Sequence, residues 1–250
     1  MPADAKSQRV VELCGEVGRI VDQTVLKTFK TSDYMELLKQ AGGVDTGILP
    51  FGCIYLKEGK LGKHSSNPGA AFRLYVCLER PKIRSIRFEG YDSDEPDDKF
   101  ELRTFALAMP WVVTFISFIN EGLARVVMNG IMSPGGVDSR GLNTELYHLP
   151  LPNIENEDGT FCLGDLRLDS SQPHWRRAND TLRYIDDSVW NNDLWPVWGR
   201  RVDEGESTPN VLGFKDWEEK TKNRGQGFWR ELRLLRTGGT LQSKMGELTA

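Results

Sequence analysis

Leu149–Asp165 reads LPLPNIENEDGTFCLGD, and the rest of the chain is organised around this stretch. Its prolines, Pro150 and Pro152, fix their own φ and disfavour helix in the residue before each of them. Asn156–Gly159 has the composition of a tight turn, because Asn, Asp and Gly tolerate left-handed backbone. Cys162 therefore follows a turn by a few residues, with an apolar neighbour on either side to anchor it. Such a cysteine is either a reactive thiol on a firm support or an inert packing residue, and the inert kind is the commoner.

The composition is that of a folded protein with a substantial core. The 250 residues are 39% hydrophobic and 10% aromatic, which suits one enlarged domain or a domain with long additions. The formal net charge is -4 and no basic stripe dominates, which argues against a nucleic-acid partner. No segment reads as a signal peptide, and the most apolar run, Phe105–Ile119, is too short to span a bilayer. We therefore expect a cytoplasmic protein with no membrane partner.

The cysteines are spread along the chain and form no CxxC pair: they are Cys14, Cys53, Cys77 and Cys162. This spacing is typical of reduced thiols rather than of a disulfide framework or a zinc site. The three histidines do not fall at metal-ligand spacing either. We expect no metal site and no cofactor.

The N-terminal region is predicted to be helical before it becomes a hairpin. Apolar residues recur in steps of three and four, which predicts a helix over Ser7–Lys30. A second helix is expected over Ser32–Gln40, with Gly42-Gly43 as its stop. Gly47–Leu61 reads as a hairpin that turns at Glu58-Gly59.

Strand-like runs rich in β-branched and aromatic residues come next, separated by breaks that contain Pro, Gly or Asn. They predict an antiparallel meander of about four strands between residues 72 and 132. The runs are Phe72–Leu78, Ile83–Gly90, Phe100–Leu107, Val112–Asn120 and Leu123–Met132.

Beyond Cys162 the period becomes helical, and a helix is predicted over Trp175–Asn191. An exposed loop is expected over Asp203–Pro209, a basic helix over Phe228–Arg236, and a loose tail over Thr237–Ala250. The tryptophans of this region either pack as an added C-terminal layer, which we favour, or form a partner surface.

Taken together, this plan resembles that of ubiquitin-conjugating enzymes. Their signature is His-Pro-Asn, an aliphatic residue, a short loop with Gly, and then aliphatic-Cys-Leu-Asp/Asn. Pro152-Asn153-Ile154 and Gly159-Thr160-Phe161-Cys162-Leu163 match its two parts, and Trp175-Arg176-Arg177-Ala178 is similar to the Trp-x-Pro-Ala opening of the next helix.

The match is closer to the bacterial relatives of that family, in particular the B protein of PRTRC gene systems. There, a Leu-Tyr-His run leads to a Pro-x-x-Asn turn and a Val-Cys-x-Gly ending. Glu145–His148, Pro150–Asn153 and Phe161–Gly164 are similar to that version. The resemblance covers roughly residues 145–190, with a weaker match before them.

The chain departs from the family pattern at four points, one of which is a longer insertion between Cys162 and Trp175. Leu151 stands where the eukaryotic enzymes have histidine, and the loop between Asn153 and Cys162 is one residue longer. Gly164 replaces a residue that is usually Asp or Asn, although Asp165 follows it directly.

The resemblance implies an α+β fold with an N-terminal helix, an antiparallel β-meander, a cysteine loop, a following helix and extra C-terminal elements. It divides the chain into an N-terminal helical region and hairpin (residues 1–62), a conjugating-enzyme-like core (63–200) and a C-terminal extension (201–250).

On this resemblance, Cys162 would carry a ubiquitin-like modifier as a thioester, between an activating-enzyme-like protein and a protein substrate. Asn153 would stabilise the oxyanion or brace the loop. Asp165 would help to deprotonate an incoming lysine, with Asp158 and Glu157 as the other nearby acids. The protein would then be a transferase.

Other interpretations stay open. The same fold could serve without catalysis, as an interaction or assembly component of a phage, plasmid or defence system, and the missing histidine favours this. The chain could instead be a structural subunit whose likeness to the family is accidental. Cys162 with His148 or His174 would permit a Cys-His hydrolase.

Overall fold

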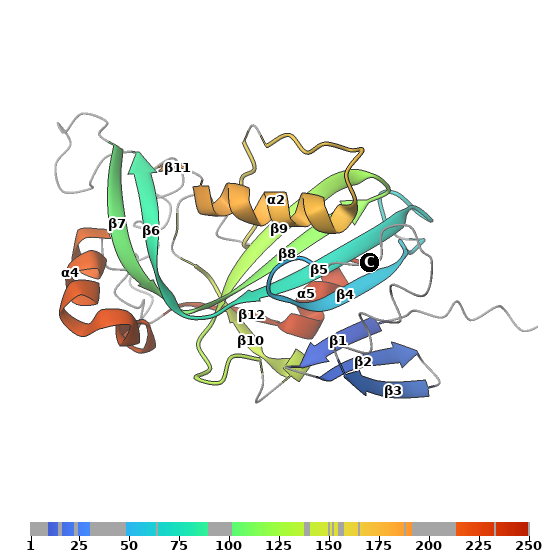
Figure 1. Cartoon of the computed structure of the whole chain (residues 1–250), viewed down its shortest axis with the longest axis horizontal. Coiled ribbons are helices and arrows are strands. Elements are labelled where there is room, and N and C mark those ends of the chain that lie inside the picture. The colour runs from blue at the N-terminus through green and yellow to red at the C-terminus, as the bar shows by residue number, and fades with distance from the viewer. Residues whose placement is uncertain are drawn as a thin grey trace, which may run out of the picture.

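The structure is a computed structural model (Figure 1). It describes residues 10–14, 17–22, 25–30, 49–63, 65–89, 102–137, 141–149, 151, 153–154, 158–164, 166–187, 189–191, 214–232 and 234–249. The helix predicted over Ser32–Gln40 and the loop predicted over Asp203–Pro209 lie outside these residues.

The described strands are β1 (Val10–Cys14), β2 (Val17–Asp22), β3 (Val25–Lys30), β4 (Cys53–Lys60), β5 (Ala71–Glu79), β6 (Lys82–Glu89), β7 (Leu102–Met109), β8 (Trp111–Ile119), β9 (Gly122–Ile131), β10 (Glu145–Tyr147), β11 (Val189–Asn191) and β12 (Arg236–Thr240). The helices are η1 (Gly141–Asn143), α2 (His174–Asp187), α4 (Phe214–Arg224), η2 (Gly225–Glu231) and α5 (Leu241–Glu247).

Nine of the strands form one sheet in the order β12-β10-β9-β8-β5-β4-β1-β2-β3, and every neighbouring pair in it is antiparallel. A second sheet has the order β11-β6-β7. A large antiparallel sheet with few helices agrees with the predicted α+β class. The predicted strands between residues 72 and 132 are confirmed, but they belong to two sheets rather than to one meander.

Two prolines explain why the pairing of β5 with β8 does not continue directly into the pairing of β6 with β7. Glu79 pairs with Val112 in the large sheet, and Lys82 pairs with Met109 in the small one. Both pairs obey the same register, which would place Pro81 opposite Pro110. A proline has no N–H to donate to a strand ladder, so two facing prolines interrupt the pairing. The β6–β7 half bends away from the large sheet at this point (Figure 1).

The central strands are buried on both faces. On one face of the sheet, Tyr75, Ile116 and Met128 belong to a core that also contains residues of α2. On the other face, Val76, Phe115 and Val127 belong to a second core that contains residues of α5. Alternate side chains of a strand point to opposite faces, so α2 and α5 cover opposite sides of the sheet (Figure 1).

Helix α4 protects the edge strand β7 with its side chains. The Ala106 N–H donates to Glu218 (3.1 Å), and the Ala108 N–H donates to Thr221 Oγ1 (3.0 Å). Trp217 Nε1 donates to the Ala108 carbonyl (3.2 Å). These bonds occupy main-chain groups that an open sheet edge would offer to another chain.

Two predictions for the N-terminal part are corrected. Ser7–Lys30 is not a helix, because strands β1, β2 and β3 occupy it. Its valines, isoleucine and threonines are β-branched and favour strand. Gly47–Leu61 is not a hairpin either, because β4 runs through Glu58-Gly59 without turning. Gly59 is needed inside the strand for another reason: a Cβ there would lie 3.0 Å from the Phe72 ring.

The C-terminal predictions are also corrected. The basic helix expected over Phe228–Arg236 is replaced by η2 and by the start of β12. Thr237–Ala250 is not a loose tail, because β12 and α5 are formed there. The favoured packing role of the tryptophans is confirmed for Trp217 and Trp229, which are buried in the core. No helix in the described part of the chain has the length and apolar character needed to cross a membrane.

Candidate functional site

Cys162 lies directly after a short strand-like segment at the edge of the large sheet. This segment, Gly159–Phe161, pairs with β9 through an antiparallel bridge between Thr160 and Val127. The Met128 N–H donates to the Gly159 carbonyl and the Phe161 N–H donates to the Val126 carbonyl, both at 2.8 Å. Cys162 is therefore attached to the most buried part of the sheet.

Gly159 is the residue that lets this segment approach β9. Its φ is +79°, a left-handed value that side-chain-bearing residues rarely adopt. A Cβ at this position would lie 2.7 Å from the Met128 carbonyl oxygen and 2.9 Å from Asn129 Nδ2. The sequence predicts a turn glycine here, whereas the close approach to β9 is visible only in the structure.

Asn153 is brought to Cys162 through the main chain. The Cys162 N–H donates to the Asn153 carbonyl at 2.7 Å, and Ile154 forms a bridge with Phe161. Asn153 has a φ of +64°, and asparagine is among the few residues that tolerate this backbone. Asn153 and Cys162, both of them candidate site residues, are thus held together by their main chains.

The side chains around Cys162 alternate as an extended segment requires. Phe161 is 2% exposed, Cys162 is an exposed free cysteine, and Leu163 packs partly buried against the core. The Cys162 side chain therefore faces outward, while Phe161 and Leu163 face the core. An exposed thiol is what a reaction with another macromolecule needs.

The position that departs from the family signature, Leu151, is part of the core. It is 0% exposed and packs with Leu149 and Ile154. A histidine ring at this place would need a hydrogen-bond partner inside an apolar cluster, because a buried polar group without one is destabilising. Leu151 is therefore a packing residue.

Asp158 is held in an ion pair instead of being available as a base. Arg125 Nη2 contacts its carboxylate, and the Thr160 N–H donates to it at 2.7 Å. Burial acts to raise the pKa of Asp158, but the Thr160 hydrogen bonds and the charges of Arg125 and Lys244 outweigh it and hold the pKa below its ordinary value. A carboxylate stabilised in this way is a weak base. Asp165 and Glu157 lie outside the described residues.

Tyr184 on α2 is a neighbour of this loop that no motif in the sequence indicates. A Cβ on Gly164 would lie 3.2 Å from the Tyr184 hydroxyl oxygen, and Gly164 has a φ of +48°. Both observations favour glycine two residues after Cys162, where the family has Asp or Asn. Tyr184 belongs to the helix predicted over Trp175–Asn191, but helical periodicity does not reveal what a helix touches.

The histidines of the hydrolase alternative have other contacts. His174 Nε2 lies 3.2 Å from the Asn120 carbonyl oxygen and 3.5 Å from Glu121, and its ring packs edge-on against Phe118. For His148 the structure gives a main-chain contact, because its backbone N–H donates to the Leu235 carbonyl (2.9 Å). His174 thus anchors α2 to the turn between β8 and β9.

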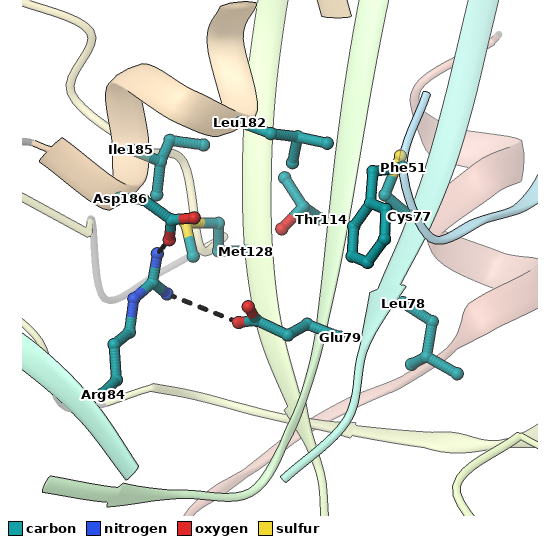
Figure 2. Close-up of a pocket in the computed structure, with 10 residues that line it drawn as sticks. All are labelled: Phe51, Cys77, Leu78, Glu79, Arg84, Thr114, Met128, Leu182, Ile185 and Asp186. Atoms are coloured by element: carbon teal, nitrogen blue, oxygen red, sulfur yellow. Dashed lines mark hydrogen bonds and ion pairs between the residues drawn. The ribbon is translucent and has the colours of Figure 1, made fainter. Parts of the chain in front are cut away.

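A separate cavity of about 60 Å³ opens between α2 and the sheet. One end is polar, because Arg84 lies between Asp186 and Glu79 (Figure 2). Apolar side chains, among them Met128, line much of the remainder. Figure 2 also shows Cys77 beside the Phe51 ring at the other end of the cavity.

Among the described residues, no group of three or more His, Cys, Asp or Glu side chains is placed to hold a metal ion. In comparisons with known proteins, no protein-family model, no curated protein and no solved structure matches this chain.

Proposed function

We propose that this protein is a ubiquitin-conjugating-enzyme-like transferase of prokaryotic type that carries a ubiquitin-like modifier as a thioester on Cys162. One observation carries the proposal. Cys162 is exposed while both of its neighbours pack toward the core, and its N–H is bonded to the Asn153 carbonyl at 2.7 Å. The cysteine and the asparagine of the proposed signature therefore share one braced turn, followed in the chain by α2.

The proposed reaction has two acyl transfers. The Cys162 thiolate attacks the thioester carbonyl that links the modifier to the activating enzyme; a new C–S bond forms and the old one breaks, which releases the enzyme's thiolate. A lysine amine of the substrate then attacks the same carbonyl, so that a C–N bond forms, the C–S bond breaks and the amine loses a proton. Both steps need open space on one side of the sulfur, and an exposed cysteine provides it.

Asn153 and Asp165 are the proposed supporting residues. The Asn153 amide would donate to the oxyanion that forms in each step, and Asp165 would orient or deprotonate the lysine. Asp158 is left out of this scheme, because its carboxylate is engaged by Arg125 and Thr160.

The test is a charging assay with ATP and with candidate modifiers and activating enzymes, taken from genes beside this one. Wild-type protein should gain a band that disappears on reduction, and Cys162→Ala should not form it. Cys162→Ser should form either no band or an ester band that the reductant does not remove. A Cys162→Ala protein that still forms a reducible band would show that another residue is the acceptor.

Asn153→Gly refines the assay. Glycine keeps the left-handed backbone at this position and removes only the amide, so charging and transfer should slow by about 100-fold while the fold is retained. Asn153→Ala is the contrasting variant, because it adds backbone strain to the same loss. Equal rates for wild type and Asn153→Gly would remove the amide from the mechanism.

The alternative is a non-catalytic protein of the same kind that serves as an interaction or assembly component. Two observations favour it, because they leave neither side chain available for catalysis: Leu151 is buried in the core, and Asp158 is held in an ion pair. If the wild type is never charged by any candidate partner, and Cys162→Ala still supports the activity of the surrounding gene system, this alternative replaces the enzyme.

A further inference from the structure

Two cysteines far from the Cys162 loop in the chain face each other across β4 and β5. Cys53 and Cys77 are Cα partners in this strand pair, next to an irregularity where the register shifts between Cys53 and Tyr55. The Leu78 N–H donates to the Gly52 carbonyl (2.8 Å), while the Cys53 N–H turns away to the Pro50 carbonyl (3.0 Å). This pattern identifies Cys53 and Cys77 as a non-hydrogen-bonded pair, in which side chains lie closer than in the alternating hydrogen-bonded pairs.

The two thiols are free and buried. Cys53 is 9% exposed and Cys77 is 4% exposed. Cys53 Sγ donates to the Tyr55 carbonyl at 3.3 Å. The hydrogen bond between the two thiols, followed by burial, raises the pKa of Cys77. Cα atoms of a non-hydrogen-bonded pair are about 4.5 Å apart, which lies within the range of about 4.4–6.8 Å that a disulfide spans.

The cavity beneath α2 provides a route to this pair. Cys77 lines the cavity, whose volume is about 60 Å³. A single water molecule needs only about 10–15 Å³ of such space, so a molecule as small as hydrogen peroxide fits. In Figure 2 the Cys77 side chain lies at the edge of the cavity beside Phe51, which is 85% exposed.

We propose that Cys53 and Cys77 form an oxidisable dithiol, which a peroxide converts into an intrachain disulfide between β4 and β5. This site is separate from Cys162 and does not depend on the proposed transferase activity.

The reaction balances with the peroxide as the only co-reactant. Cys77 must first lose its proton, and its raised pKa makes this step slow at neutral pH. The thiolate then attacks one peroxide oxygen, so that an S–O bond forms, the O–O bond breaks and the departing hydroxide takes the proton to become water. The sulfur of Cys53 then attacks the resulting sulfenic acid; the S–S bond forms, the S–O bond breaks and a second water leaves. Two thiols lose two electrons and two protons, and the peroxide is reduced to two waters.

The disulfide would link β4 to β5 covalently, next to the turn that contains Phe51. That turn is already held to α2, because the Phe51 N–H donates to the Asn179 side chain at 2.8 Å. Closing a loop of this length in the unfolded chain stabilises the folded state. We expect the oxidised protein to melt roughly 5–10 °C higher than the reduced one.

The experiment uses the full chain with Cys14→Ser and Cys162→Ser, so that only Cys53 and Cys77 remain. After treatment with hydrogen peroxide, both thiols should disappear in a thiol titration, and the mass should fall by two hydrogens. Peptide mapping without reductant should join the two cysteine-containing segments, and a dithiol reductant should reverse every change.

Two controls keep the result decisive. Adding Cys53→Ser to the same background should leave a single thiol that forms no intrachain disulfide. Peptide mapping of peroxide-treated wild type tests the natural sequence, in case a substitution disturbs folding. The proposal is overturned if both thiols persist while the exposed Cys162 of the wild type is oxidised, or if Cys53 pairs with Cys14, which lies on the neighbouring strand β1.

Discussion

Gly159 determines how closely the cysteine segment can approach the sheet. Gly159→Ala should destabilise the fold by about 3 kcal/mol or more, because it combines an unfavourable left-handed backbone with a clash at 2.7 Å against the Met128 carbonyl. Urea unfolding of the two proteins measures this difference.

Gly69→Ala is the matched control for that measurement. Gly69 has nearly the same φ, +78°, but no atom lies within 4 Å of the position of its Cβ. Its replacement should therefore cost only the backbone strain, about 1–2 kcal/mol. Equal losses at both positions would show that the contact with β9 does not constrain the segment.

Asp158 should make stability depend on pH at the acid end. Its pKa is held below the ordinary value in the folded state, and an unfolded aspartate titrates near about 3.9. A depressed folded pKa contributes stability that is fully present well above the unfolded pKa and is lost as the pH falls through the folded pKa. Asp158→Asn should therefore unfold more easily than wild type at pH 7, and the difference should shrink below about pH 4.

Thermal melts between pH 2 and pH 7 check this prediction. Asp169→Asn is a comparison in an exposed loop, where hydrogen bonds from Ser171 and Gln172 and the charge of Arg177 lower the pKa. Solvent screens these interactions, so its effect on the melts should have the same sign as that of Asp158→Asn and be smaller. A constant gap between wild type and Asp158→Asn across the range would contradict the assignment.

The helix α2 is fastened to the sheet near its N-terminus by a buried guanidinium. Arg177 is 2% exposed, binds the carbonyl and carboxylate of Glu121, and stacks over Phe118 at 5.0 Å. Arg177→Ala should destabilise the fold by about 2–3 kcal/mol, because it removes these hydrogen bonds and the packing of the side chain together.

The control lies on the same helix. Arg183 is 76% exposed, and its ion pair with Asp180 is long, at 3.9 Å. The unfolding free energy of Arg183→Ala should therefore stay within about 0.5 kcal/mol of the wild-type value. Similar unfolding midpoints for both alanine variants would mean that α2 is held in place by its apolar face alone.

In the described part of the molecule, the central strands of the large sheet are covered on both sides, and helix α5 lies on one of them. Leu241 is 0% exposed and Met245 is 3% exposed in the core beneath α5. Leu241→Ala should destabilise the protein by about 3 kcal/mol. Gln242→Ala, at an exposed position of the same helix, should be nearly neutral, and urea unfolding separates the two. If Leu241→Ala left the stability unchanged, the C-terminal residues would not contribute to the core, as their composition predicts.

Local chemistry explains the elements that the sequence predicted correctly. The strands between residues 72 and 132 are bounded by Pro81, Pro110 and Gly122, and their β-branched and aromatic residues favour strand in any context. The helix after the cysteine has a clear period, but it ends at Asp187 instead of Asn191, because Val189–Asn191 forms β11 and pairs with β6. The exposed Cys162 and buried Phe161 also follow from alternation along an extended segment.

Only the tertiary structure decided the remainder, because it depends on partners that are distant in the chain. Ser7–Lys30 satisfies a helical period, yet it forms strands whose pairing with β4 adds them to the large sheet. Thr237–Ala250 has a polar composition, yet β10 and the second core give β12 and α5 a place to pack. The roles of Asp158 and Tyr184, and the pairing of Cys53 with Cys77, likewise arise from contacts across strands and helices. Sequence periodicity records which residues can face the same way, whereas the free energy of burial depends on what lies opposite them.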